Sequence, residues 1–232
     1  YPKGSLKARF CVRGKELLYR YCSERNIAFR QCGKIIVASK KEQVPVVAEY
    51  IQKAKANGVG DLRWIEAGEV MELEPEVKAV GAVLSPSTGI IDSHAFMLSL
   101  QSDIECHGGM IALLTKVIEI ESSDSQRIVR TPDFELAADW IINSAGLAAT
   151  ELAADTPKAP KGFYAKGHYY SYSGNQPFNR LVYPVAEAGG LGVHVTLDLA
   201  GQVKFGPDVR LSLIHISEPT RQAEMAYAVF CL

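Results

Sequence analysis

Ala138-Asp-Trp-Ile-Ile-Asn-Ser-Ala-Gly-Leu-Ala-Ala-Thr150 is the stretch around which the expected fold is organised. The apolar run from Trp140 to Ile142, bounded by polar residues, predicts a short buried strand. Small residues at 144–146 predict a turn, and residues 147–154 predict a short helix. A strand that ends in such a turn can present backbone N–H groups to a phosphate. A single glycine is a weaker signal than G-x-G-x-x-G, so spacing alone favours an ordinary strand-to-helix turn.

Composition bounds the class of protein. The chain has 232 residues, of which 47% are apolar, and a net charge of −1. It can build a sizeable core in one large or two small domains, and its charge does not favour nucleic acid as a partner. No apolar run is long enough to cross a membrane, and no signal peptide opens the sequence. We therefore expect a cytoplasmic protein, and peripheral contact with an inner membrane stays open.

The cysteine pattern argues against a disulfide framework and against a zinc site. The number of cysteines is odd, and no C-x-x-C pair occurs. No cluster of His, Cys and carboxylate residues has the spacing of metal ligands, so we expect no metal. Reduced thiols in a cytosolic protein are the simplest interpretation. The five cysteines are Cys11, Cys22, Cys32, Cys106 and Cys231.

The first part of the chain alternates helical and extended patterns. Apolar residues at helical spacing, with Asn-Gly and Gly-Gly stops, predict helices over 5–26, 43–56, 65–74 and 93–107. Apolar and β-branched runs predict strands over 29–39, 80–84 and 110–121. A hairpin is expected to join 127–130 to 134–136 around Thr131-Pro-Asp133.

After Pro157 the pattern changes to short aromatic, alternating segments separated by turn signals. These segments, 167–172, 181–183, 192–196 and 202–205, predict an antiparallel sheet. The fold class is therefore a mixture of α+β and α/β, with two interleaved domains. Residues 211–232 change character again and resemble a translated sequencing adapter, so we expect a non-native tail that contributes nothing to function.

Six short motifs occur in the same order as in a known family. The chain resembles the flavin-dependent L-2-hydroxyglutarate dehydrogenases (oxidases) of the D-amino-acid-oxidase-like (DAO) superfamily, over nearly all of residues 1–210. The motifs are Gly4-Ser-Leu-Lys-Ala-Arg-Phe-Cys11, Cys32-Gly-Lys-Ile-Ile-Val-Ala38, Ser87-Thr-Gly-Ile-Ile-Asp92, Ile142-Asn-Ser-Ala-Gly146, Lys166-Gly-His-Tyr169, and Leu191-Gly-Val-His194 followed by Phe205-Gly-Pro207.

The resemblance implies a Rossmann-like FAD-binding domain interleaved with a substrate domain that is built on a mostly antiparallel sheet. It assigns 1–30 and 90–156 to part of the first domain, and 31–89 and 157–210 to the second. It implies FAD as the cofactor and L-2-hydroxyglutarate, a small dicarboxylate hydroxy acid, as the substrate. Oxygen, a quinone or an electron carrier would re-oxidise the flavin. A glycine- or sarcosine-type amine oxidase and an inert fragment stay open as alternatives.

The resemblance also implies segments that this sequence does not contain. Relatives carry a strand, G-x-G-x-x-G and a helix for the FAD pyrophosphate before the position of Tyr1. They also carry a histidine-containing segment there, and a C-terminal segment beyond the position of Arg210. We therefore expect an internal fragment that does not retain FAD when it is expressed as written.

His194 is the candidate catalytic base. It lies between Val193 and Val195 in an extended pattern, so its side chain points to the opposite face from theirs. Oxidising a 2-hydroxy acid needs a base for the hydroxyl proton, and a neutral imidazole suits that role. A hydrogen-bonded histidine of the sheet is the structural alternative, and the histidine of the absent segment competes for the same role.

The resemblance implies further site residues. Lys166, Tyr169 and Tyr183 would bind the two substrate carboxylates, since a dianion needs cations and hydroxyl donors. Packing residues are the commoner role for tyrosines. The turn of Ser144, Ala145, Gly146 and Leu147 would contact the flavin cofactor. Val117 would lie on a strand beside the adenine, and a plain core strand is the equally open alternative.

Overall fold

The structure is a computed structural model, and it contains two compact units. The first comprises Tyr1–Leu100 with Ala165–Leu232, and the second comprises Gln101–Tyr164. These bounds are defined by how densely the residues of each unit contact one another. The predicted division into cofactor and substrate domains is defined by what each part binds, and it stays a prediction. The residues described are 1–122, 126–154, 156, 159, 161–185 and 192–212.

The helices of the first unit begin and end close to the predicted positions. Helix α1 begins after Ser5, whose hydroxyl accepts a hydrogen bond from the Ala8 backbone N–H at 3.2 Å. Helix α4 begins after Asp92, whose carboxylate caps the Ala95 N–H at 2.9 Å. The helical elements are α1 (Leu6–Glu24), the 3₁₀ turn η1 (Lys41–Gln43), α2 (Val44–Ala56), α3 (Ala67–Leu73) and α4 (Ser93–Cys106), which continues into the second unit.

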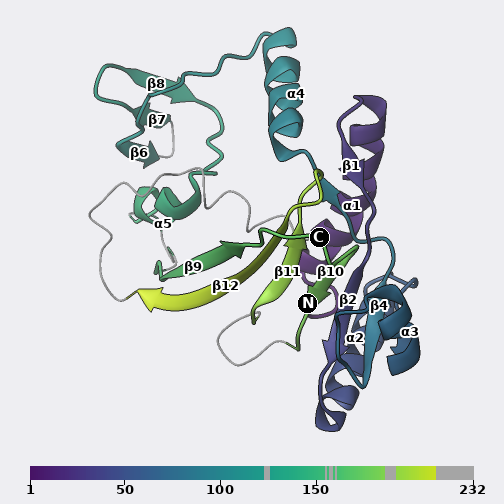
Figure 1. Ribbon diagram of the computed structural model, residues 1–232. Helices are drawn as coiled ribbons and strands as arrows, with labels where there is room; N and C mark the ends of the chain where they lie inside the picture. The colour runs from purple at the N-terminus through teal and green to yellow at the C-terminus, as the bar shows by residue number, and fades with distance from the viewer. Residues whose placement is uncertain (123–125, 155, 157–158, 160, 186–191, 213–232) are drawn as a thin grey trace. The chain divides into compact units, whose positions relative to one another are not determined.

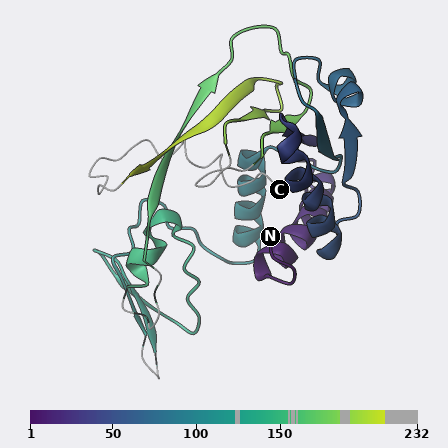
Figure 2. The same cartoon turned by 90° about the horizontal axis from the view of Figure 1, so that it is seen from below.

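A seven-stranded sheet forms the centre of the first unit, in the order β3-β4-β2-β10-β11-β12-β9. Strands β2 and β10 pair in parallel, whereas β3–β4, β2–β4, β10–β11 and β11–β12 are antiparallel, which confirms a mostly antiparallel sheet. The long strands β9 and β12 run side by side in both views (Figure 1, Figure 2). The strands are β2 (Lys34–Ala38), β3 (Arg63–Glu66), β4 (Gly81–Ser85), β9 (Tyr164–Ser171), β10 (Leu181–Tyr183), β11 (His194–Leu197) and β12 (Val203–Ser212); a separate pair joins β1 (Phe29–Arg30) to β5 (Ile90–Ile91).

The two faces of this sheet carry different residues. Ile35, Val182 and Val195 stand in register across β2, β10 and β11 and belong to the main core. On the opposite face, Val83 packs with Val47 of α2 in a second, smaller core. Because paired residues share a face, the side chains of Lys34, Tyr183 and His194 lie on the same face as this second core.

A buried carboxylate joins α3 to the segment before β10. Glu74 is 0% exposed, and its carboxylate accepts a hydrogen bond from the Asn179 backbone N–H at 3.0 Å. The Arg180 guanidinium donates to the same carboxylate at 3.3 Å and to the Leu73 carbonyl at 3.1 Å. Both partners come from a segment more than a hundred residues away in the chain, so this contact closes a long loop.

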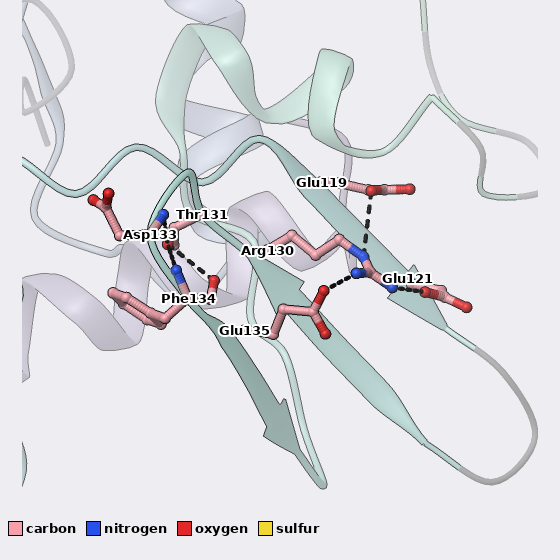
Figure 3. A network of polar contacts seen from close by, with 7 residues as sticks. All are labelled: Glu119, Glu121, Arg130, Thr131, Asp133, Phe134 and Glu135. Atoms are coloured by element: carbon pink, nitrogen blue, oxygen red, sulfur yellow. Dashed lines mark hydrogen bonds and ion pairs between the residues drawn. The ribbon is translucent and has the colours of Figure 1, made fainter.

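The second unit contains a three-stranded antiparallel sheet. Strands β6 (Glu119–Ser122), β7 (Arg127–Arg130) and β8 (Glu135–Ala138) pair in chain order, which confirms the predicted hairpin. Thr131 forms its turn, because its hydroxyl accepts from the Phe134 N–H at 3.0 Å and its own N–H donates to the Phe134 carbonyl at 2.9 Å (Figure 3). A 3₁₀ turn η2 (Gly146–Ala148) and the short helix α5 (Ala149–Leu152) follow.

Two predicted strands of the second unit are wrong. The run 110–121 is extended only from Glu119, and Leu114 adopts a positive φ of 55°. The run Trp140–Ile142 is not a strand, and its two ends are 85% and 89% exposed. An apolar run becomes a buried strand only where neighbouring strands supply hydrogen-bond partners and a packed face. Within the described part of the second unit, neither 110–118 nor 140–142 pairs in such a sheet.

Three smaller departures lie in the first unit. The predicted helix over 65–74 begins at Ala67, because Trp64 and Ile65 pair with β4. The predicted strand over 29–39 is interrupted before Lys34, where Gly33 turns the chain with a φ of +76°. The predicted tail also overlaps β12, which continues to Ser212, and the rest of that tail lies outside the described residues.

Arg130 holds three glutamates together across the sheet of the second unit. Its guanidinium contacts Glu121 at 2.7 Å, Glu119 at 3.4 Å and also Glu135 (Figure 3). The substitution Arg130→Gln would leave the three negative charges side by side without their cation. Their repulsion should destabilise the sheet, so we expect faster amide hydrogen exchange in β6–β8. The effect should shrink in about 1 M salt, which screens the repulsion. Equal exchange in the Arg130→Gln protein and the wild type at low salt would show that the cluster stabilises nothing.

Candidate active site

A row of aromatic side chains crosses the sheet of the first unit on one face. The His194 side chain on β11 lies in this row and is 4% exposed. Its ring stacks on Tyr183 of β10, with ring centroids 4.2 Å apart and an angle of 22° between the planes. Tyr169 of β9 approaches the imidazole edge-on from the other side, at 6.2 Å and 78°. The structure therefore brings together the predicted base and two of the three predicted substrate residues.

Gly206 makes this row possible. It pairs with His194 in the β11–β12 ladder and lies between His194 and β9. A Cβ atom there would lie 2.7 Å from the Tyr169 ring and 2.7 Å from the His168 carbonyl oxygen. Because glycine has no side chain, the Tyr169 ring can cross β12 and reach the imidazole.

We expect Gly206→Ala to push the Tyr169 ring away from His194. Its φ of +154° is also unfavourable for a residue with a side chain. The ring-current shift of the His194 imidazole protons, measured by NMR on ¹³C-histidine protein, should change in this variant. Gly58→Ala, at a positive φ where nothing lies near the added carbon, is the control for backbone strain. Unchanged His194 resonances in Gly206→Ala would contradict the proposed role of the glycine.

The surroundings of His194 favour a neutral imidazole with a defined tautomer. Its Nδ1 lies 3.2 Å from the Gly192 carbonyl oxygen. A carbonyl can only accept, so Nδ1 carries the hydrogen and Nε2 keeps its lone pair. Burial lowers the pKa of His194; the contact with Gly192 opposes this, and the positive charge of Lys34 adds to the lowering. This imidazole can therefore accept a proton at Nε2 near neutral pH.

Lys34 is a member of the row that was not predicted from the sequence. Its ammonium lies 5.0 Å from the centre of the Tyr183 ring, a cation–π contact, and its side chain is half-buried. The parallel pairing of β2 with β10, which places Leu181 opposite Lys34, brings it there. The only signal in the sequence was the motif at 32–38, which carries no information on which strand will lie beside it.

Lys166 is not brought to this row. It is exposed on β9, three residues before Tyr169. Side chains alternate along a strand, so an odd spacing places Lys166 on the opposite face from Tyr169.

The predicted cofactor residues lie in the second unit. Asn143 organises the turn, because its side chain accepts from the Ala145 N–H at 3.2 Å and donates to the Ala149 carbonyl at 2.9 Å. Gly146 has a φ of +58°, and nothing lies within 4 Å of where a Cβ would stand. The exposed turn of 144–147 therefore leaves its backbone open to close approach, which fits the binding of a phosphate-containing cofactor such as FAD. Val117 is half-buried and lies outside the regular strands, one residue before Ile118, whose N–H donates to Arg130.

Among the described residues, no three or more His, Cys, Asp or Glu side chains are arranged so that they could hold a metal ion. In the same part of the chain, none of the helices has the length and apolar character needed to cross a membrane.

Comparisons with known proteins show which proteins this chain is similar to. The chain is 40% identical to mitochondrial L-2-hydroxyglutarate dehydrogenase of Arabidopsis thaliana, over 90% of this chain and 51% of that protein. It is 33% identical to L-2-hydroxyglutarate dehydrogenase of Indibacter alkaliphilus, over 91% of this chain and 55% of that protein. It thus spans about half the length of the curated relatives it matches.

Similar solved structures support the same fold. The crystal structure of L-proline dehydrogenase from P. horikoshii superposes with a TM-score of 0.77 at 18% identity, over 92% of this chain and 58% of that chain. The sequence pattern of the DAO family, described as FAD dependent oxidoreductases, matches residues 1–228. This match reaches into the segment 211–232, whose non-native origin stays a prediction. Sequence and fold agree, and the chain belongs to the DAO family of FAD dependent oxidoreductases.

Proposed function

We propose that the complete protein is an FAD-dependent 2-hydroxy-acid dehydrogenase that converts L-2-hydroxyglutarate to 2-oxoglutarate. The observation that carries the proposal is the buried His194, whose Nδ1 lies against the Gly192 carbonyl and whose pKa is lowered by burial. The proposed substrate is the one named in the relatives at 40% and 33% identity, which are L-2-hydroxyglutarate dehydrogenases.

The reaction removes a proton from the hydroxyl oxygen and a hydride from the carbon that bears it. His194 would accept the hydroxyl proton at Nε2, and its Nδ1–H bond to Gly192 would hold the ring in the competent tautomer. Tyr183 and Tyr169 would keep water from the imidazole and fix its plane. FAD, when bound, would supply the hydride acceptor, and oxygen, a quinone or an electron carrier would take up the electrons.

The cofactor would be held in part by the turn of Ser144, Ala145, Gly146 and Leu147, and beside Val117. What supports this is the open approach to the backbone at Gly146. The functional division stays part of the proposal: 1–30 and 90–156 would serve FAD, and 31–89 and 157–210 would serve the substrate.

The test of the function uses the complete reading frame that contains these residues, loaded with FAD. Anaerobic L-2-hydroxyglutarate should bleach the flavin absorbance and yield 2-oxoglutarate. Glycine and sarcosine, the substrates of the alternative amine-oxidase class, should not bleach it. Faster flavin reduction by either amine than by the hydroxy acid would contradict the proposal.

The pH dependence of flavin reduction gives a further prediction. Reduction should slow as the pH falls, because protonated His194 has no lone pair at Nε2. Burial lowers the pKa of His194, so the midpoint of this loss should lie below the ordinary histidine value of about 6.5. Stopped-flow reduction at saturating substrate across this pH range measures the midpoint. A midpoint at or above the ordinary value would mean that another group is the base.

A further inference from the structure

The aromatic row ends in a positive charge. Lys34, Tyr183 and His194 come from the neighbouring strands β2, β10 and β11, and Tyr183, on the strand between, contacts both of the others. By strand register and ring contact, the titratable groups on the face of the imidazole are Lys34 of β2, Tyr183 of β10, Lys204 of β12 and Tyr169 of β9. The positive charge of Lys34 acts on the imidazole and lowers the pKa of His194.

Arg180 and Lys166 are two other cations of the first unit, and neither lies beside the aromatic row. Arg180 donates to Glu74 and to the Leu73 carbonyl. Lys166 lies on the face of β9 opposite to that of Tyr169. A substrate held beside the His194 imidazole would lie within the width of one aromatic ring, that of Tyr183, from the Lys34 ammonium.

We propose that Lys34 binds the substrate carboxylate remote from the reacting carbon, and thereby selects dicarboxylate hydroxy acids over monocarboxylates. The inference rests on the proposed function. His194 must lie at the hydroxyl, so the carboxylate next to that carbon lies near the imidazole. The width of one aromatic ring separates Lys34 from this position, which suits a second carboxylate a few carbons away. A half-buried ammonium forms a charge-assisted hydrogen bond with such a group.

The position of Lys34 also opposes amine substrates. A substrate ammonium placed at the imidazole would stand near a second positive charge in a partly buried site, where repulsion is screened less than in water. The same repulsion disfavours protonated His194. One lysine would therefore favour an anionic substrate and help to keep the base neutral.

The first test needs no cofactor and uses the full chain with ¹³C-labelled histidine. Glutarate, a redox-inert dicarboxylate, should shift the His194 imidazole resonance, and butyrate should bind at least about tenfold more weakly, since it lacks one charge-assisted contact. Lys34→Met should weaken the binding of glutarate by a similar factor and raise the pKa of His194. Lys34→Arg should retain most of the binding, which separates loss of charge from loss of folding.

Two control variants make the test specific. Lys78→Met removes an exposed lysine of the same unit and should change neither glutarate binding nor the pKa of His194. Lys166→Met tests the lysine that was predicted from the sequence to bind a substrate carboxylate, and its effect on glutarate binding is compared with that of Lys34→Met. The inference is overturned if glutarate does not shift the His194 resonance in the wild type, or if the Lys34→Met protein binds glutarate as tightly as the wild type. It is also overturned if glutarate binding is lost in Lys166→Met and not in Lys34→Met.

A second test separates this inference from the proposed function. In FAD-loaded protein, Lys34→Met should raise the KM for L-2-hydroxyglutarate about tenfold or more and remove its preference over 2-hydroxybutyrate, while the limiting rate changes little. If glutarate binding depends on Lys34 but L-2-hydroxyglutarate does not reduce the flavin, the reaction is wrong and the dicarboxylate site stands. If L-2-hydroxyglutarate reduces the flavin equally in both proteins, the role of Lys34 is wrong and the function stands.

Discussion

His194→Ala should lower the limiting rate of flavin reduction by about 10²–10⁴-fold, the usual contribution of a general base. The substrate dissociation constant should change far less, because the proton is transferred only in the transition state. Stopped-flow reduction over a range of L-2-hydroxyglutarate concentrations separates the two quantities. The imidazole lies in a row of packed rings, so circular dichroism of the variant must first match the wild type.

His107→Ala is the matched control for this substitution. The His107 side chain is exposed at the end of α4, where its ring contacts the Asp103 carbonyl at 2.7 Å. We expect no change in the reduction rate there. If His194→Ala reduces the flavin within a few-fold of the wild type, the base lies elsewhere, and the competing N-terminal histidine of the resemblance becomes the candidate.

The site could be predicted from the sequence where local alternation decides it. The flanking valines indicated that His194 points away from their face. Val195 does lie in the main core, whereas Val193 precedes β11 and is 56% exposed. The neighbours of His194 could not be derived from this pattern. Lys34 and Tyr183 meet through the parallel pairing of β2 with β10, whose residues lie about 150 positions apart in the chain. Register between such distant segments depends on packing of the whole sheet.

The fold shows the same contrast. Caps and turn residues are local signals, and the helices that begin after Ser5 and Asp92 were predicted within one or two residues. Apolar runs are ambiguous, because they describe what a strand would bury and not whether a partner is present. This is why 181–183 became a buried strand, with β2 and β11 on either side, whereas 140–142 did not.

Glu74→Ala is the substitution outside the active site with the largest expected effect. It removes the acceptor for the Asn179 N–H and leaves the partly buried Arg180 without its carboxylate. Removing one partner of a buried ion pair costs about 3 kcal/mol or more in the free energy of unfolding. Trp64 lies in the first unit and Trp140 in the second, so a Trp140→Phe background lets urea unfolding of the first unit be followed by Trp64 fluorescence.

Two variants separate the charge of Glu74 from its hydrogen bonds. Glu76→Ala removes an exposed carboxylate two residues away and should change the free energy of unfolding by no more than about 0.5 kcal/mol. Glu74→Gln keeps an oxygen that can accept from Asn179, so it should cost clearly less than alanine. An alanine variant as stable as Glu76→Ala would show that the buried carboxylate does not join α3 to the segment before β10.

The pH dependence of the Glu74→Gln comparison has a defined sign. Burial raises the pKa of Glu74 in the folded chain, against the opposing contacts from Asn179 and Arg180. The native state then holds this proton more tightly than the unfolded state, so the contribution of Glu74 to stability falls as the pH rises above the ordinary carboxyl value. Glutamine has no such proton. The stability of the wild type relative to Glu74→Gln should therefore decrease from about pH 4 towards neutrality, and a relative stability that increases over this range would mean that Arg180 outweighs burial.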